Sequence, residues 1–187
     1  NGIAIDVLRD QAIERGKTGS IWHGRTWPPE LESEAAHRAI QLAVVAGSPL
    51  YIVHLSSSNA LTEVARARDD GRNVFAETCP QYLYLSLEEH LDQPGIDGVR
   101  HICSPPLREF SDGHQDNLWK GLRTDDLSVV ATDHCPFCDA EKMLGAEDFR
   151  QTPNGLGVIE HRMDLLFQGV LQGEITLQRW VEICSTT

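Results

Sequence analysis

The sequence predicts an α/β fold built on a parallel sheet. Short apolar runs predict strands over residues 50–54, 73–78 and 127–132, and stretches with helical spacing separate them. Such alternation is typical of parallel strands joined by right-handed crossovers. Residues 50–53 and 129–132 are apolar or β-branched and lead directly into His54 and Asp133, so these two strands are expected to be buried on both faces. In parallel α/β folds chemistry is found at this carboxyl end of the strands.

The remaining elements follow from periodicity and from turn residues. Ser57 or Ser58 is suited to be the N-cap of the helix after the first strand, and Thr176 of the last helix. Two proline-containing stretches are expected to be loops, residues 21–29 and 104–108. A loop of about twenty residues after Phe137 is long enough to suggest a function. Helices are expected over 3–16, 29–46, 59–70, 114–123, 157–171 and 176–184, with one turn at 86–91 and an extended segment at 99–103.

Composition sets limits on the class of protein. The 187 residues suffice for one domain with a sizeable core, and we treat 1–187 as one domain. The net charge of −12 argues against nucleic-acid and anionic-membrane partners, and no apolar run approaches the ~20 residues of a membrane span. Five cysteines without regular spacing favour a reducing compartment, so a cytoplasmic location is expected. The start at Asn1-Gly2-Ile3 suggests a piece of a longer protein.

His54 and Asp133 are the leading candidates for chemistry. We expect them to meet at one rim of the sheet and to hold a metal ion, where Asp133 could also take a proton from metal-bound water. Each has a simpler alternative. His54 could be a buried histidine bonded to a backbone carbonyl, and Asp133 could cap a turn or pair with an arginine. Glu77, at the end of the second strand, could be a base, a cap or an ion-pair partner.

Three further motifs each allow two interpretations. The C-x-x-C of Cys135 and Cys138 could be a thiol–disulfide site or half of a Cys₄ zinc site. No second C-x-x-C exists, and the residues around Lys142 to Gly145 are expected to form a loop rather than the helix of a thioredoxin-like site. The stretches 104–109 and 153–155 could be structural turns, or rigid shelves whose main-chain groups bind a substrate amide.

Together these pieces resemble the dihydropyrimidinase/hydantoinase family of cyclic amidohydrolases. The resemblance covers nearly the whole chain in family order, and ETCPQYL, SPPLRE and TDHCPF together make it specific. Asn1-Gly2 resembles the tail of the family's His-Ala-Glu-Asn-Gly segment. The matching stretches are RTWPPELESEA (25–35), YIVHLS (51–56), ETCPQYL (77–83), SPPLRE (104–109), TDHCPF (132–137) and PNGLGVIEHR (153–162).

The resemblance implies roughly the second half of a metal-dependent (β/α)8 barrel, without the family's small β-sandwich. It implies two zinc ions bridged by a carboxylated lysine, with His54 and Asp133 as metal ligands and Asp133 as the group that moves the proton. It implies that the backbone at Ser104 and Asn154 holds the cyclic amide, and that the protein is a dimer or tetramer. The other ligands and the bridging lysine match no residue here, so the chain alone is expected to be inactive.

Two relatives of that family remain as alternatives. One is the non-catalytic dihydropyrimidinase-related scaffold proteins, which lose metal ligands. Here both visible ligand positions, His54 and Asp133, are present, which favours an enzyme. The other is a sister amidohydrolase such as allantoinase, and the stretches TDHCPF and SPPLRE favour the dihydropyrimidinase/hydantoinase side.

Overall fold

A computed structural model describes residues 1–186 and contains one small parallel sheet. Its strands are β1 (Leu50–Ile52), β2 (Val74–Thr78) and β3 (Val129–Val130), in the order β1-β2-β3. Ile52 lies opposite Ala76, and Thr78 lies opposite Val130. The three strands therefore end at the same edge of the sheet, as the alternation of elements predicts. All three predicted strands are present, although β1 and β3 are shorter than expected.

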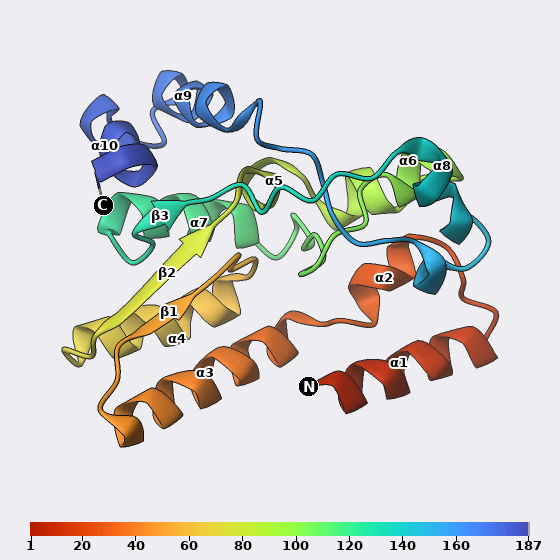
Figure 1. Ribbon diagram of the computed structural model, residues 1–187, viewed down its shortest axis with the longest axis horizontal. Coiled ribbons are helices and arrows are strands. Elements are labelled where there is room, and N and C mark those ends of the chain that lie inside the picture. Colours follow the sequence, from red (N-terminus) through yellow and green to blue (C-terminus); the bar gives the residue numbers. More distant parts are fainter. Residues whose placement is uncertain (187) are drawn as a thin grey trace.

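Figure 1 shows α1 and α3 along one side of the molecule and α9 and α10 on the opposite side. None of the helices within residues 1–186 is both long and apolar enough to cross a membrane. The α-helices are α1 (Gly2–Glu14), α2 (Ile21–Arg25), α3 (Pro29–Ala46), α4 (Ser58–Asp69), α5 (Pro80–Tyr84), α6 (Ile96–Val99), α7 (His114–Thr124), α8 (Asp139–Lys142), α9 (Arg162–Gln172) and α10 (Leu177–Val181). Short 3₁₀ turns cover Met143–Gly145 and Phe149–Gln151, and π-helical turns cover Leu87–Leu91 and Glu182–Thr186.

Local sequence explains why α3 and α4 begin and end where they do. Pro29 opens α3, where its missing N–H is not needed, and Gly47 ends it in the left-handed conformation. The Ser57 hydroxyl accepts a hydrogen bond from the Ala60 N–H and so caps α4. The two helices pack against each other, α3 also against β1 and α4 against β2. They cover one face of the sheet, and that side forms the core.

The other face of β1 and β2 is uncovered, which corrects the expectation that the first strand is buried on both faces. Val74 and Ala76 of β2 point into the core, whereas Phe75 between them is exposed. Tyr51 and Val53 are exposed in the same way on and after β1. The alternation arises because α3 and α4 pack on one face only. Apolar side chains on both faces of a strand make it suitable for burial on both sides. They do not show that this chain covers both sides.

Several predicted segments differ from the structure. Residues 21–25 form α2 although prolines 28 and 29 suggested a loop, because those prolines lie beyond the helix. The expected helix over 157–171 begins only at Arg162, since the Val158 and Ile159 N–H groups donate to the His134 ring nitrogen Nδ1 instead (3.1 and 3.2 Å). A tertiary contact thus overrides helical propensity there. The segment expected to be extended at 99–103 follows α6 as a turn.

Candidate active site

The carboxyl edge of the sheet gathers the predicted ligand residues. Beyond the strands proper, the Leu55 N–H donates to the Glu77 carbonyl (2.8 Å) and the Ala131 N–H donates to the Thr78 carbonyl (3.0 Å). These hydrogen bonds keep the three segments side by side beyond the last paired residues of the strands. The residues that follow, His54 after β1 and Asp133 after β3, therefore lie at one edge, with the end of β2 between them.

His54 occupies a constrained position at this edge. Its φ of 40° is in the left-handed region, which is uncommon for a residue with a side chain. Its N–H donates to Glu77 Oε1 (3.4 Å), while the Tyr51 hydroxyl donates to Glu77 Oε2 (2.6 Å). Burial and the Glu77 charge raise the pKa of Tyr51. Of the three roles considered for Glu77, the structure shows that of a cap, which holds the backbone that presents His54.

The His54 ring keeps one nitrogen without a partner. Nδ1 is buried, and it makes no hydrogen bond within the described part of the chain. The simpler alternative, a histidine whose buried nitrogen is bonded to a backbone carbonyl, therefore does not describe Nδ1. A buried polar atom that lacks a partner is costly and calls for an explanation, of which an ion is one. The ring of His54 therefore fits a metal-ligand role.

Asp133 is exposed, which corrects one premise behind its selection. The sequence suggested a carboxylate at the end of a buried strand, but β3 ends three residues earlier, at Val130. Like His54, Asp133 has a positive φ, 47°. Burial first, and then the negative charges of Glu77 and Asp133, raise the pKa of the Cys79 thiol. Glu77 and Asp133 thus place two carboxylates near this edge, which suits a cation.

The structure thus places His54 and Asp133 just after the two outer strands, at the same edge of the sheet. Within residues 1–186 no group of three or more His, Cys, Asp or Glu side chains has the arrangement of a metal site. The two residues provide part of a ligand set at most. Their predicted roles as ligands remain predictions.

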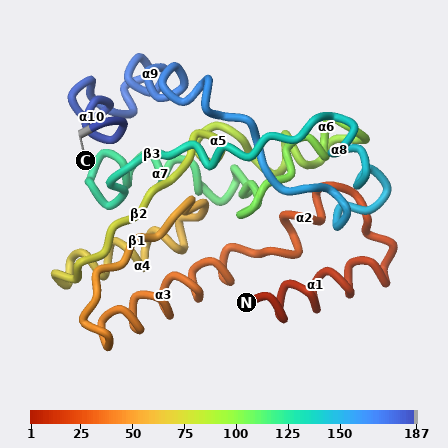
Figure 2. The backbone as a smooth tube through the Cα atoms, in the orientation of Figure 1, coloured from red at the N-terminus to blue at the C-terminus, as the bar shows by residue number. Residues whose placement is uncertain are grey.

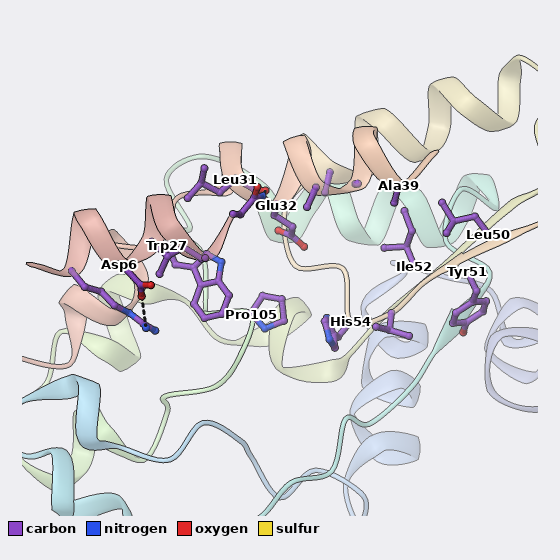
Figure 3. Close-up of a pocket in the computed structure, with 18 residues that line it drawn as sticks. Asp6, Trp27, Leu31, Glu32, Ala39, Leu50, Tyr51, Ile52, His54 and Pro105 are labelled. Carbon is purple, nitrogen blue, oxygen red and sulfur yellow. Dashed lines mark hydrogen bonds and ion pairs between the residues drawn. The ribbon is translucent and has the colours of Figure 1, made fainter. Parts of the chain in front are cut away.

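A mostly apolar cavity of about 570 Å³ adjoins His54. Figure 3 shows His54 beside Pro105, with Leu50 and Ile52 of β1 pointing toward α3 and Tyr51 on the other side of the strand. Trp27 and Glu32 line the same cavity from the opposite wall. Such a concave, largely apolar space with a few polar groups is typical of small-molecule sites.

The segment around Ser104 forms one wall of this cavity through Pro105. The Pro105 carbonyl accepts hydrogen bonds from the Tyr82 hydroxyl (2.9 Å) and from the Cys103 thiol (3.2 Å), and the Ser104–Pro105 peptide is cis. Tyr82 is buried, which raises its pKa well above the ordinary value and keeps the hydroxyl a donor. Sequence analysis did not single out Tyr82, although it lies inside the stretch ETCPQYL.

The segment around Asn154 lies against the same wall. The Gly155 N–H donates to the Ile102 carbonyl (3.1 Å), two residues before Ser104. A Cβ added at Gly155 would lie 2.3 Å from the Cys135 carbonyl oxygen, so only glycine permits this approach. The structure therefore brings together the segments of Ser104 and Asn154, the two residues predicted to bind substrate. Figure 2 shows the long connections that carry these segments crossing the middle of the molecule.

A buried ion pair that sequence analysis missed supports both His54 and the Ser104 segment. The Arg108 guanidinium donates to Glu32 Oε2, to the Ser56 hydroxyl (3.0 Å each) and to the Trp27 carbonyl (2.5 Å). Glu32 in turn accepts from the Ser56 N–H (2.7 Å) and hydroxyl (2.8 Å). The network joins α3, the turn after His54 and the loop after Ser104. The sequence signal was present only as two charged residues of unknown separation in space.

Cys135 and Cys138 are both exposed and free. The loop expected around Lys142 to Gly145 is wrong, because α8 begins directly after Cys138 and includes Lys142, and a 3₁₀ turn covers Met143–Gly145. The Cys138 N–H donates to Glu141 Oε2 (2.8 Å), which closes a capping box at this helix start. A cap of this kind explains the position of Cys138 by helix structure alone.

Comparisons with known proteins agree on one group of enzymes. No protein-family model matches the chain. It is 54% identical to a D-hydantoinase from Streptomyces coelicolor and 46% identical to one from Geobacillus stearothermophilus, in both cases over its whole length. The structure of the dihydropyrimidinase from Brevibacillus agri matches 98% of the chain with a TM-score of 0.93 and 45% identity. The chain spans about 40% of the length of these relatives.

Proposed function

Because this chain belongs to the D-hydantoinase/dihydropyrimidinase family, we propose that it supplies part of the active site for hydrolysis of a cyclic amide. The substrate is a hydantoin or dihydropyrimidine ring, which opens to an N-carbamoyl amino acid. The observation that carries the proposal is the placement of His54 and Asp133 at one carboxyl edge, within a chain that matches these enzymes from end to end. A non-catalytic relative would not need both residues.

We propose that His54 and Asp133 hold zinc at this edge together with ligands from outside the chain. The unpartnered Nδ1 of His54 and the two carboxylates near this edge, Glu77 and Asp133, support this assignment. When bound, zinc lowers the pKa of its water and polarises the carbonyl that is attacked. Both residues follow strands, so a rigid sheet sets their separation.

The chain's own residues have distinct parts in the reaction. The Asp133 carboxylate accepts the proton of the attacking water, and it returns this proton to the ring nitrogen as the carbon–nitrogen bond breaks. The main-chain groups of Ser104 and Asn154 hold the cyclic amide, whose polar edge matches backbone N–H and C=O groups.

The architecture fits a larger barrel of which this chain is one part. We propose that residues 1–187 form roughly the second half of a (β/α)8 barrel domain, whose inner face is the uncovered face of β1 and β2. Tyr51, Val53 and Phe75 are exposed there, as side chains of an unfilled barrel interior would be.

Assembly and location follow from the same proposal. We propose a homo-oligomer, a dimer or a tetramer, and exposed apolar side chains on α9 such as Phe167 and Leu171 offer it a surface. All five cysteines are free, which fits a reducing, cytoplasmic environment. Sedimentation velocity tests the oligomeric state, and a monomer at micromolar concentration would contradict it.

The test uses a hybrid enzyme, defined as the Streptomyces coelicolor D-hydantoinase with its matched segment replaced by this chain. We expect it to bind zinc and to hydrolyse hydantoin or 5,6-dihydrouracil, whereas the 187-residue chain alone does neither. His54→Ala is expected to lower the zinc content, and Asp133→Asn to lower kcat by about 10²–10⁴-fold. The matched controls are His37→Ala and Asp69→Asn, both at exposed helix positions. Native zinc content and turnover in both site variants would overturn the assignment.

A further inference from the structure

Lys142 is buried in a part of the chain where a lysine is not expected. It is the last residue of α8, only 3% of its surface is exposed, and burial lowers its pKa. Its Nζ donates to the Ile102 carbonyl (2.7 Å) and to the Pro153 carbonyl (2.9 Å), and the Phe137 ring centre lies 5.6 Å away. The partners of this ammonium are therefore two main-chain oxygens and an aromatic face.

The two carbonyls belong to the two segments that are proposed to hold the substrate. Ile102 lies two residues before Ser104, and Pro153 lies directly before Asn154. The Ile102 carbonyl also accepts from the Gly155 N–H (3.1 Å), so it has a donor from each side. One ammonium group and one backbone bond thus fix the spacing between the segments.

Burying a lysine for packing alone is unfavourable. Transfer of an ammonium group out of water is costly unless donors and acceptors compensate it. An apolar side chain of the same length would fill the space, but it would leave the Ile102 carbonyl with one donor and the Pro153 carbonyl without the Nζ donor. The arrangement is accordingly explained by what the ammonium holds, which is the relative position of two loops.

We propose that Lys142 is a positioning residue that sets the separation of the Ser104 and Asn154 segments and thereby the fit of the cyclic amide. The proposal rests on the proposed function, because it assigns those segments to substrate binding. Lys142 donates with its Nζ to the far side of each segment and is not itself a substrate contact. Its loss therefore weakens binding in the ground state and in the transition state alike, which raises KM and leaves kcat nearly unchanged.

The first measurement needs no activity. In the 187-residue chain, hydrogen exchange of the Gly155 amide is compared between the native sequence and Lys142→Met, with the exposed Lys120→Met as control. We expect exchange at Gly155 to become at least about tenfold faster in Lys142→Met only, since its acceptor loop is released. If Lys142→Met does not fold, Lys142→Gln, which keeps a neutral donor, takes its place. Unchanged protection at Gly155 would overturn the proposal.

The second measurement uses the hybrid enzyme. We expect Lys142→Met to raise KM for hydantoin by about tenfold, with kcat within about threefold and with native zinc content. Lys142→Arg retains N–H donors, so its KM is expected to lie between that of the native sequence and that of Lys142→Met. A native KM in Lys142→Met overturns the inference while the proposed function stands. An inactive hybrid enzyme with Lys142 in place counts against the proposed function. The hydrogen-exchange measurement then tests the positioning role of Lys142 by itself.

Discussion

Replacing Arg108 by methionine tests whether the buried ion pair holds the site together. The Arg108 side chain is 3% exposed and that of Glu32 is 14% exposed, so water screens the pair poorly. The substitution removes donors from Glu32, from Ser56 and from the Trp27 carbonyl. It leaves a largely buried carboxylate without its counter-charge, and such a loss costs about 3–5 kcal/mol. Because Ser56 still donates two hydrogen bonds to Glu32, we expect a value near the lower end, about 3 kcal/mol.

The assay is urea denaturation of the 187-residue chain, followed by tryptophan fluorescence. Arg123→Met is the matched control, since the Arg123–Glu174 pair is 44% and 36% exposed and contributes at most about 1 kcal/mol. A double variant, Arg108→Met with Glu32→Leu, separates the charge from the packing. We expect it to regain at least about 1 kcal/mol over Arg108→Met, because no unpaired charge remains buried.

The reasoning is refuted if the free energies of unfolding of Arg108→Met and Arg123→Met differ by less than about 1 kcal/mol, which is the most that an exposed ion pair contributes. It is also refuted if the double variant is less stable than Arg108→Met alone. Either result would mean that water reaches Glu32 despite its low exposure. The network would then not be what fixes the turn after His54 against the loop after Ser104.

Two more predictions concern titratable groups. His23 is buried, its Nε2 donates to the Cys103 carbonyl (2.7 Å), and burial lowers its pKa to about 4. Since the unfolded histidine titrates near 6.5, stability is retained above pH 6.5 and is lost by about 3 kcal/mol as the pH falls toward 4; in His23→Gln, denaturation across this range should show a loss smaller by that amount. Thiol labelling followed by mass spectrometry should modify the exposed cysteines first and the buried ones only in denaturant, because burial raises the pKa of Cys103 to about 12 and also raises that of Cys79. Early labelling at Cys79 or Cys103 would contradict this order, in which Cys135 and Cys138 react first.

Much of the fold could be predicted because the signals were local. Pro29 and Gly47 determined both ends of α3, and the Ser57 cap determined the start of α4. The order of strands and helices gave the parallel sheet. The late start of α9 depends on a contact distant in sequence, because the Val158 and Ile159 N–H groups donate to the His134 ring. No property of residues 157–161 taken alone reveals this.

The sequence allowed candidate site residues to be named, but it said less about their environment. His54 and Asp133 could be selected as side chains that follow apolar strands, but the exposure of Asp133 could not, because it depends on which parts of the fold cover it. Lys142 was expected to lie in a loop. The two carbonyls that it binds lie 40 and 11 residues away in the sequence, so no local pattern pointed to them. The partner of a charged residue cannot be identified from the sequence when it lies far away along the chain. The contacts that support the candidate site were therefore harder to predict than the candidate residues themselves.

The backbone at the ends of β1 and β3 adds an argument that the sequence could not supply. His54 and Asp133 both adopt positive φ, whereas Cys79 after β2 has an ordinary φ of −132°. A left-handed conformation costs a residue with a side chain on the order of 1 kcal/mol, and glycine would avoid that cost. Asp125, at the C-terminal end of α7, also has a positive φ of 66°, in the conformation usual for a residue that ends a helix. At the edge of the sheet, the same cost is incurred at the two predicted ligand positions and is absent at Cys79 between them, which is the pattern expected if His54 and Asp133 serve the proposed site.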